Sequence, residues 1–107
     1  MGKYTRLAGF VLAAICFAAP MLAQNPGEAI YKQNCEVCHG TDGQANTPIA
    51  KALKAQSLKA PVIIKKSDAE LMEFVKQGKG NMPAFGTKLN DSQIKEVIAY
   101  VRTLQKK

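Results

Sequence analysis

Three reactive side chains lie within the five residues Cys35-Glu36-Val37-Cys38-His39. Two thiols separated by two residues and followed directly by a histidine form the C-x-x-C-H attachment signature of c-type haem. The spacing suits this chemistry, because one helical turn separates the sulfurs by the span of the two haem vinyl groups, and each thiol forms a thioether with one of them. His39 then follows as the proximal iron ligand. The motif predicts one covalently attached haem.

Three other chemistries could use the same cysteines. A thioredoxin-like pair requires a βαβ context, which the sequence lacks. A zinc site requires four ligands, but Cys35, Cys38 and His39 supply three, and His39 is the only histidine. A disulfide between such close neighbours gains little loop-closure entropy and leaves His39 unexplained. The haem interpretation is therefore favoured.

The sixth iron ligand cannot be a second histidine, so methionine, lysine, water or no ligand remain. Met72 falls within an expected helix, where methionine commonly fills the core. Met82 precedes Pro83 in an expected loop, and proline stiffens the backbone that would hold a weak thioether ligand. We predict that His39 and Met82 ligate the iron.

The elements that would position these residues are helices. Capping signals begin three of them: Asn25-Pro26, with a helix to about Asn34 or Cys38, Ser67 with Glu70, and Asn90 with Gln93. The Ser67 helix is expected to end at Gly78 and the Asn90 helix at about Gln105. The last helix has an apolar stripe with helical spacing, formed by Ile94, Val97, Ile98, Val101 and Leu104. We also expect a short helix from Thr47 to Leu53, a core-lining loop over 62–64 and an apolar loop over 79–86.

The N-terminal segment differs from the rest of the chain. Lys3 and Arg6 precede an apolar run over 7–19, and small residues follow up to Ala23. This order predicts a secretory signal peptide over 1–23, with cleavage near Ala23, and one domain over 24–107. The apolar run is shorter than the roughly 20 residues of a transmembrane helix, although an uncleaved signal would tether the protein peripherally to a membrane. Cys16 is interpreted as an apolar member of the signal.

Together these motifs resemble a class I c-type cytochrome, specifically a small bacterial monohaem one. The resemblance is carried by the haem-attachment motif, by Met82-Pro83-Ala84-Phe85 and by the helix over 97–101. It implies an all-α, small cytochrome c fold of three to five helices around one covalently bound haem c. It also implies that the N- and C-terminal helices cross, with Gly27, Tyr31 and Tyr100 at the crossing.

The same resemblance assigns further site residues. A proline carbonyl in the family accepts the Nδ1–H of the proximal histidine, and Pro48 is the matching residue here. Phe85 matches the aromatic residue that guards the haem edge. The chain has no tryptophan to bind a haem propionate, so Asn81, Lys79 or Lys88 would take that role.

A haem closed by His39 and Met82 has no open position for a substrate, so we expect a monomeric electron carrier rather than an enzyme. The middle of the chain contains eight lysines: Lys51, Lys54, Lys59, Lys65, Lys66, Lys76, Lys79 and Lys88. They are typical either of a soluble surface with excess lysine or of one that steers the protein toward acidic docking patches on redox protein partners. Nucleic acid is a poor partner for an exported haem protein. The carrier would act in a bacterial periplasm. The alternatives are a haem peroxidase or gas-binding sensor with a displaceable methionine, and a haem-bearing subunit of a larger complex.

Overall fold

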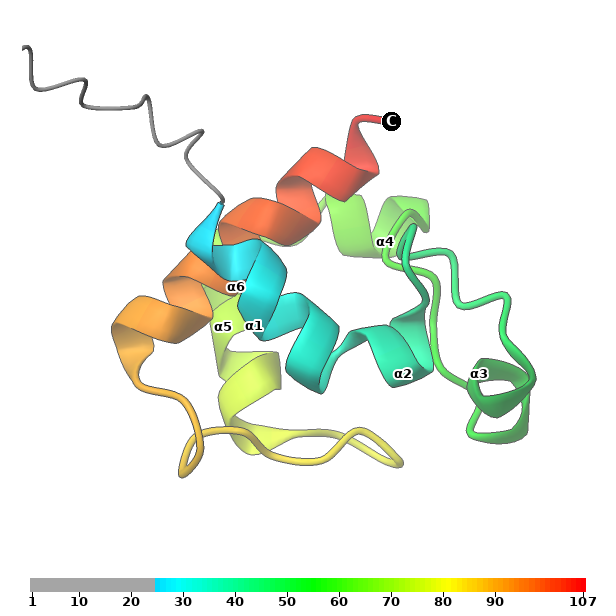
Figure 1. Cartoon of the computed structure of the whole chain (residues 1–107), viewed down its shortest axis with the longest axis horizontal. Helices are drawn as coiled ribbons and strands as arrows, with labels where there is room; N and C mark the ends of the chain where they lie inside the picture. The colour runs from blue at the N-terminus through cyan, green and yellow to red at the C-terminus, as the bar shows by residue number, and fades with distance from the viewer. Residues whose placement is uncertain (1–24) are drawn as a thin grey trace, which may run out of the picture.

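The computed structural model describes residues 25–107, and in this part of the chain six helices and no strand are present (Figure 1). They are α1 (Pro26–Asn34), α2 (Glu36–His39), α3 (Pro48–Ala52), α4 (Pro61–Ile64), α5 (Asp68–Gln77) and α6 (Asp91–Gln105). The predicted all-α class is confirmed, with one helix more than the expected maximum. The predicted signal peptide, its cleavage near Ala23 and Cys16 lie outside the described residues.

The expected helix starts are present, and each is capped by a side chain. The Asn25 side chain accepts a hydrogen bond from the Gly27 N–H, and the Ser67 hydroxyl accepts one from the Glu70 N–H. Asn90 and Gln93 form a reciprocal capping box at the start of α6. These bonds satisfy N–H groups that have no partner within the helix, which explains why the sequence located the starts correctly.

The segment over 62–64 is a correction to the sequence analysis, because it forms α4 rather than a loop. Pro61 occupies the first helical turn, where its fixed φ suits the helix and its missing N–H costs nothing. No side chain caps α4, so the usual sequence signal is missing. Ile63 packs against the core, while Val62 and Ile64 are 52% and 44% exposed.

Helices α1 and α6 cross in contact, as predicted (Figure 1). Gly27 makes this approach close, because a Cβ there would clash with the backbone carbonyl of Glu96 and lie 3.0 Å from the Tyr100 Cβ. The rings of Tyr31 and Tyr100 pack at a centroid distance of 5.3 Å. The crossing thereby fixes α1 against α6, and the haem-attachment motif continues from the C-terminal end of α1.

The buried apolar side chains form two clusters, and α6 contributes to both. The first cluster combines α5, the following loop and α6 through Leu71, Val75, Phe85, Leu89, Ile94 and Ile98. The second combines α1 and α6 through Tyr31, Val97, Val101 and Leu104. Two neighbouring faces of α6 therefore join the two parts of a thin core.

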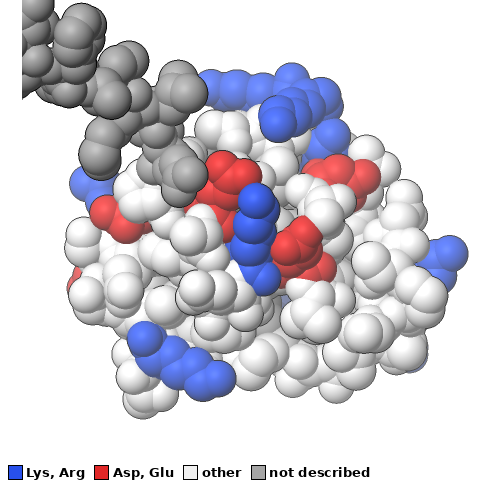
Figure 2. Space-filling model, viewed as in Figure 1, with Lys and Arg blue, Asp and Glu red and all other residues white. Residues whose placement is uncertain are grey.

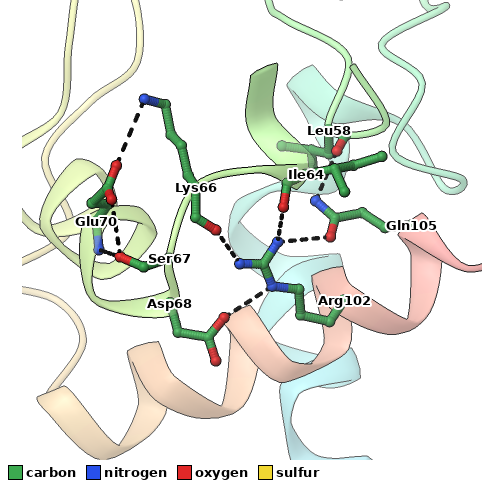
Figure 3. A network of polar contacts seen from close by, with 8 residues as sticks. All are labelled: Leu58, Ile64, Lys66, Ser67, Asp68, Glu70, Arg102 and Gln105. Carbon is green, nitrogen blue, oxygen red and sulfur yellow. Dashed lines mark hydrogen bonds and ion pairs between the residues drawn. The ribbon is translucent and has the colours of Figure 1, made fainter. Parts of the chain in front are cut away.

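Arg102 ties the C-terminal half of α6 to the chain between α4 and α5 (Figure 3). Its Nε lies 2.9 Å from the Asp68 carboxylate, and its guanidinium also donates to the carbonyls of Ile64 and Lys66. One turn later, Gln105 donates to the Leu58 carbonyl at 2.9 Å. These bonds hold the segment over 58–68 against α6.

No helix within 25–107 is both long and apolar enough to cross a bilayer.

Candidate functional site

A cavity of about 490 Å³ is lined by residues of both core clusters. This volume falls in the range of about 300–1,000 Å³ that is typical of cofactor and small-molecule sites. Five of the six residues predicted for the site line it: Cys35, Cys38, His39, Met82 and Phe85. Pro48 does not. The fold thus brings the C-x-x-C-H motif together with a methionine that lies more than forty residues later in the sequence.

The two cysteines and the histidine come from the junction of α1 and α2. The N–H groups of Cys38 and His39 both donate to the Cys35 carbonyl, at 3.2 and 2.9 Å, so one helical turn spans the motif. Cys35 and Cys38 are free thiols and are partly buried. Burial, with a smaller contribution from Cys38, raises the pKa of Cys35 to about 11. The Cys35 sulfur is therefore a neutral thiol at neutral pH, and no disulfide joins the pair.

The His39 ring is oriented by a backbone carbonyl other than the predicted one. Its Nδ1 lies 3.0 Å from the carbonyl oxygen of Gln56. The assignment of Pro48 is therefore wrong, because Pro48 begins α3 and lies outside the cavity lining. A carbonyl can only accept, so Nδ1 carries the proton and the lone pair of Nε2 is left for another partner. Burial lowers the pKa of His39, which favours this neutral form.

Met82 is held in a tight turn next to α5. The backbones of Lys79 and Met82 exchange two hydrogen bonds, at 2.9 and 3.1 Å. Gly78 has a φ of +69°, and a Cβ there would lie 2.6 Å from the Met82 carbonyl oxygen, so a side chain cannot be accommodated. Beyond the turn, the Phe85 N–H donates to the Val75 carbonyl at 2.9 Å. Met72 packs on the first core cluster but does not line the cavity.

Positive and apolar side chains share the rest of the cavity wall. Lys66 and Lys79 place their Nζ atoms 5.1 and 5.5 Å from the centroid of the Phe74 ring. Of the three propionate candidates, Lys79 and Asn81 line the cavity, whereas Lys88 lies over the ring of Phe85. The lining also contains half-exposed apolar residues, namely Val37, Leu53 and Val62. Figure 2 shows that the surface over α2 and α3 is largely uncharged on the face viewed.

Comparisons with known proteins show what this chain is similar to. Residues 23–101 match the family model described as cytochrome C oxidase, cbb3-type, subunit III. The chain is 35% identical to cytochrome c6 of a Picosynechococcus species, over 94% of this chain and 92% of that protein. It is 38% identical to the cbb3-type cytochrome c oxidase subunit FixP of Bradyrhizobium diazoefficiens, over 73% of this chain but 26% of that subunit. The solved KustC0563 c-type cytochrome superposes with a TM-score of 0.67 at 31% identity, covering 74% of this chain and 96% of that one.

Proposed function

This chain belongs to the c-type cytochrome family, and from that membership we propose that it carries single electrons with one haem c held in the cavity. The observation that carries the proposal is the convergence of two thiols, an imidazole and a thioether on one cavity. When bound, haem c supplies an iron that gains and loses one electron between Fe(III) and Fe(II). The roles of the individual residues follow from their chemistry.

Cys35 and Cys38 would attach the cofactor covalently. Each free thiol adds across one vinyl group: the sulfur forms the carbon–sulfur bond, and the thiol proton goes to the other vinyl carbon, so no oxidant is needed. The helical turn that contains both residues sets the separation of the two bonds.

His39 and Met82, which both line the cavity, would be the protein ligands of the haem iron. The bond from His39 Nδ1 to the Gln56 carbonyl leaves Nε2 as the ligand atom and limits rotation of the ring. A methionine ligand and an apolar wall both favour the reduced state, and the wall, which includes Phe85, keeps water from the metal. A site closed in this way transfers electrons and does not bind a substrate.

The partner would be another redox protein with an acidic surface. After loss of Lys3 and Arg6 with the signal, 13 basic and 8 acidic residues leave a net charge of +5, which supplies long-range attraction, and Lys54, Lys66 and Lys79 place positive charge around the cavity. The basic and apolar N-terminal sequence supports export, so we place the protein, after cleavage near Ala23, in a bacterial periplasm. The match to an oxidase subunit family supports a second candidate, in which the chain is the haem-bearing part of a larger redox complex.

Carbon monoxide titration of the reduced, haem-loaded protein tests the ligand assignment. We expect the wild type to bind carbon monoxide slowly, because Met82 occupies the iron, and Met82→Ala to bind it rapidly. Met72→Leu is the matched control, because it changes a methionine outside the cavity lining and nearly conserves volume. Rapid binding by the wild type would contradict the electron-carrier function and favour a haem peroxidase or gas sensor. Rapid binding by Met72→Leu alone would show that Met72, and not Met82, is the iron ligand.

A further inference from the structure

One side-chain hydrogen bond joins two segments of the cavity wall that are distant in sequence. The Asn81 amide nitrogen donates to the Leu53 carbonyl oxygen at 2.9 Å, across a separation of 28 residues. Both residues line the cavity, and Asn81 directly precedes Met82. This bond therefore connects the turn that carries Met82 with the chain that follows α3.

The acceptor side of this bond is shaped by local backbone hydrogen bonds at the end of α3. Leu53 caps the C-terminus of α3, and Lys54 has a left-handed φ of +56°. The Ala55 N–H closes this helix end by donating to the Ala50 carbonyl at 2.8 Å. The next residue, Gln56, offers the carbonyl that orients His39. One short segment over 53–56 thus contacts the His39 ring and the turn next to Met82.

On the donor side, the Asn81 amide makes the hydrogen bond that leaves the turn. Within residues 25–107, the other hydrogen bonds of the turn over 79–82 lie between Lys79 and Met82 themselves. Met82 itself packs against the first core cluster, whereas at the tip a Cβ on Gly80 would have no atom within 4 Å, so the space beside the tip is open. The Asn81 amide is thus the polar contact that fixes the free end of the turn.

We propose that Asn81 is a positioning residue, which clamps the Met82 turn to the segment over 53–56 and thereby keeps Met82 on the iron. The inference rests on the proposed function, because it takes Met82 as the iron ligand. An amide suits the role, since the Leu53 carbonyl can only accept and needs a donor. Loss of the clamp should leave the ligand in place on average but let it dissociate more often.

The test uses haem-loaded protein and two readouts. The first is the rate at which carbon monoxide binds the ferrous protein, which is limited by release of Met82. The second is the imidazole concentration that displaces Met82 from the ferric protein, followed through the weak long-wavelength absorption band of sulfur-ligated haem. Asn81→Ala and Asn81→Asp both remove the donor at neutral pH. We expect roughly a two- to tenfold faster rate and a correspondingly lower imidazole midpoint, the effect of one net hydrogen bond.

Asn46→Ala is the matched control, because Asn46 is also exposed and its amide bonds only to the nearby Gln44 side chain. It should leave both readouts unchanged. If the wild type resists carbon monoxide and Asn81→Ala does so equally, with an unchanged imidazole midpoint, the clamp is refuted while the proposed function stands. If the wild type binds as fast as Met82→Ala, the ligand assignment is refuted and the clamp with it.

Discussion

Replacing Gly27 by alanine tests whether the crossing of α1 and α6 is as close as the structure describes. Helix propensity alone favours the change, because alanine is more stable than glycine in a helix by about 1 kcal/mol. The close contact between α1 and α6 at Gly27 disfavours the substitution. The new methyl group would overlap the carbonyl group of Glu96, with its carbon 2.6 Å from the Cβ position. Because this obstacle is backbone, it cannot rotate away, and the helices must separate.

The size of the effect follows from these two contributions. Overpacking by one methyl group in a well-packed core costs about 1–3 kcal/mol, and a backbone obstacle places Gly27 at the upper end. After subtracting the gain in propensity, we expect a net loss of about 2 kcal/mol. For a domain of this size, that corresponds to a fall in the unfolding midpoint of roughly 8–16 °C.

Thermal unfolding of the haem-loaded protein, followed by circular dichroism, measures this loss. Ala29→Gly is the control, because Ala29 is exposed on the same helix and reports propensity without the crossing. It should cost about 1 kcal/mol. An unchanged or higher midpoint for Gly27→Ala would refute the close crossing, since propensity would then dominate.

The remaining predictions concern the attachment site and a buried tyrosine. Cys35→Ala should retain at most one thioether, so the haemochrome spectrum in alkaline pyridine should shift to that of a haem with one intact vinyl group; an unshifted spectrum would contradict the attachment role. Burial raises the pKa of Tyr31 above its unfolded value of about 10, so its contribution to stability is complete below about pH 10 and falls as the pH rises further. Tyr31→Phe should cost about 1–3 kcal/mol at pH 7, because the Gly40 carbonyl loses its donor. In denaturant titrations the variant should also lose less stability above pH 10 than the wild type, and an equal loss would contradict the role of Tyr31.

Features encoded by side-chain type were predictable from the sequence. The caps at Asn25, Ser67 and Asn90 have specific donors and acceptors, so their helix starts follow from residue identity. The convergence of the motif with Met82 was expected through the haem chemistry, and the structure brings these residues to one cavity.

Features that depend on backbone groups were not predictable in the same way. The carbonyl that orients His39 belongs to Gln56, and any residue type offers the same oxygen, so the prediction fell on Pro48. The clamp from Asn81 has the same origin, because its acceptor is the backbone of Leu53. Helix α4 was missed since it starts at Pro61 without a capping side chain. In each case the feature depends on where the chain places its backbone groups and not on a particular side-chain type.

The division of the core into two clusters has a consequence for how the molecule opens. Because α6 contributes buried side chains to both clusters and Ile30 of α1 packs against both, the amides of α6, together with those of α1 across the crossing, should be the slowest to exchange with solvent. The segment over 46–57 contributes only Ala50 to the buried side chains and should form a separate unit of lower local stability. That segment contains both carbonyls that orient His39 and hold Asn81. Local opening of this segment would therefore disturb the contacts of His39 and of Asn81 together, while the crossed helices remain folded.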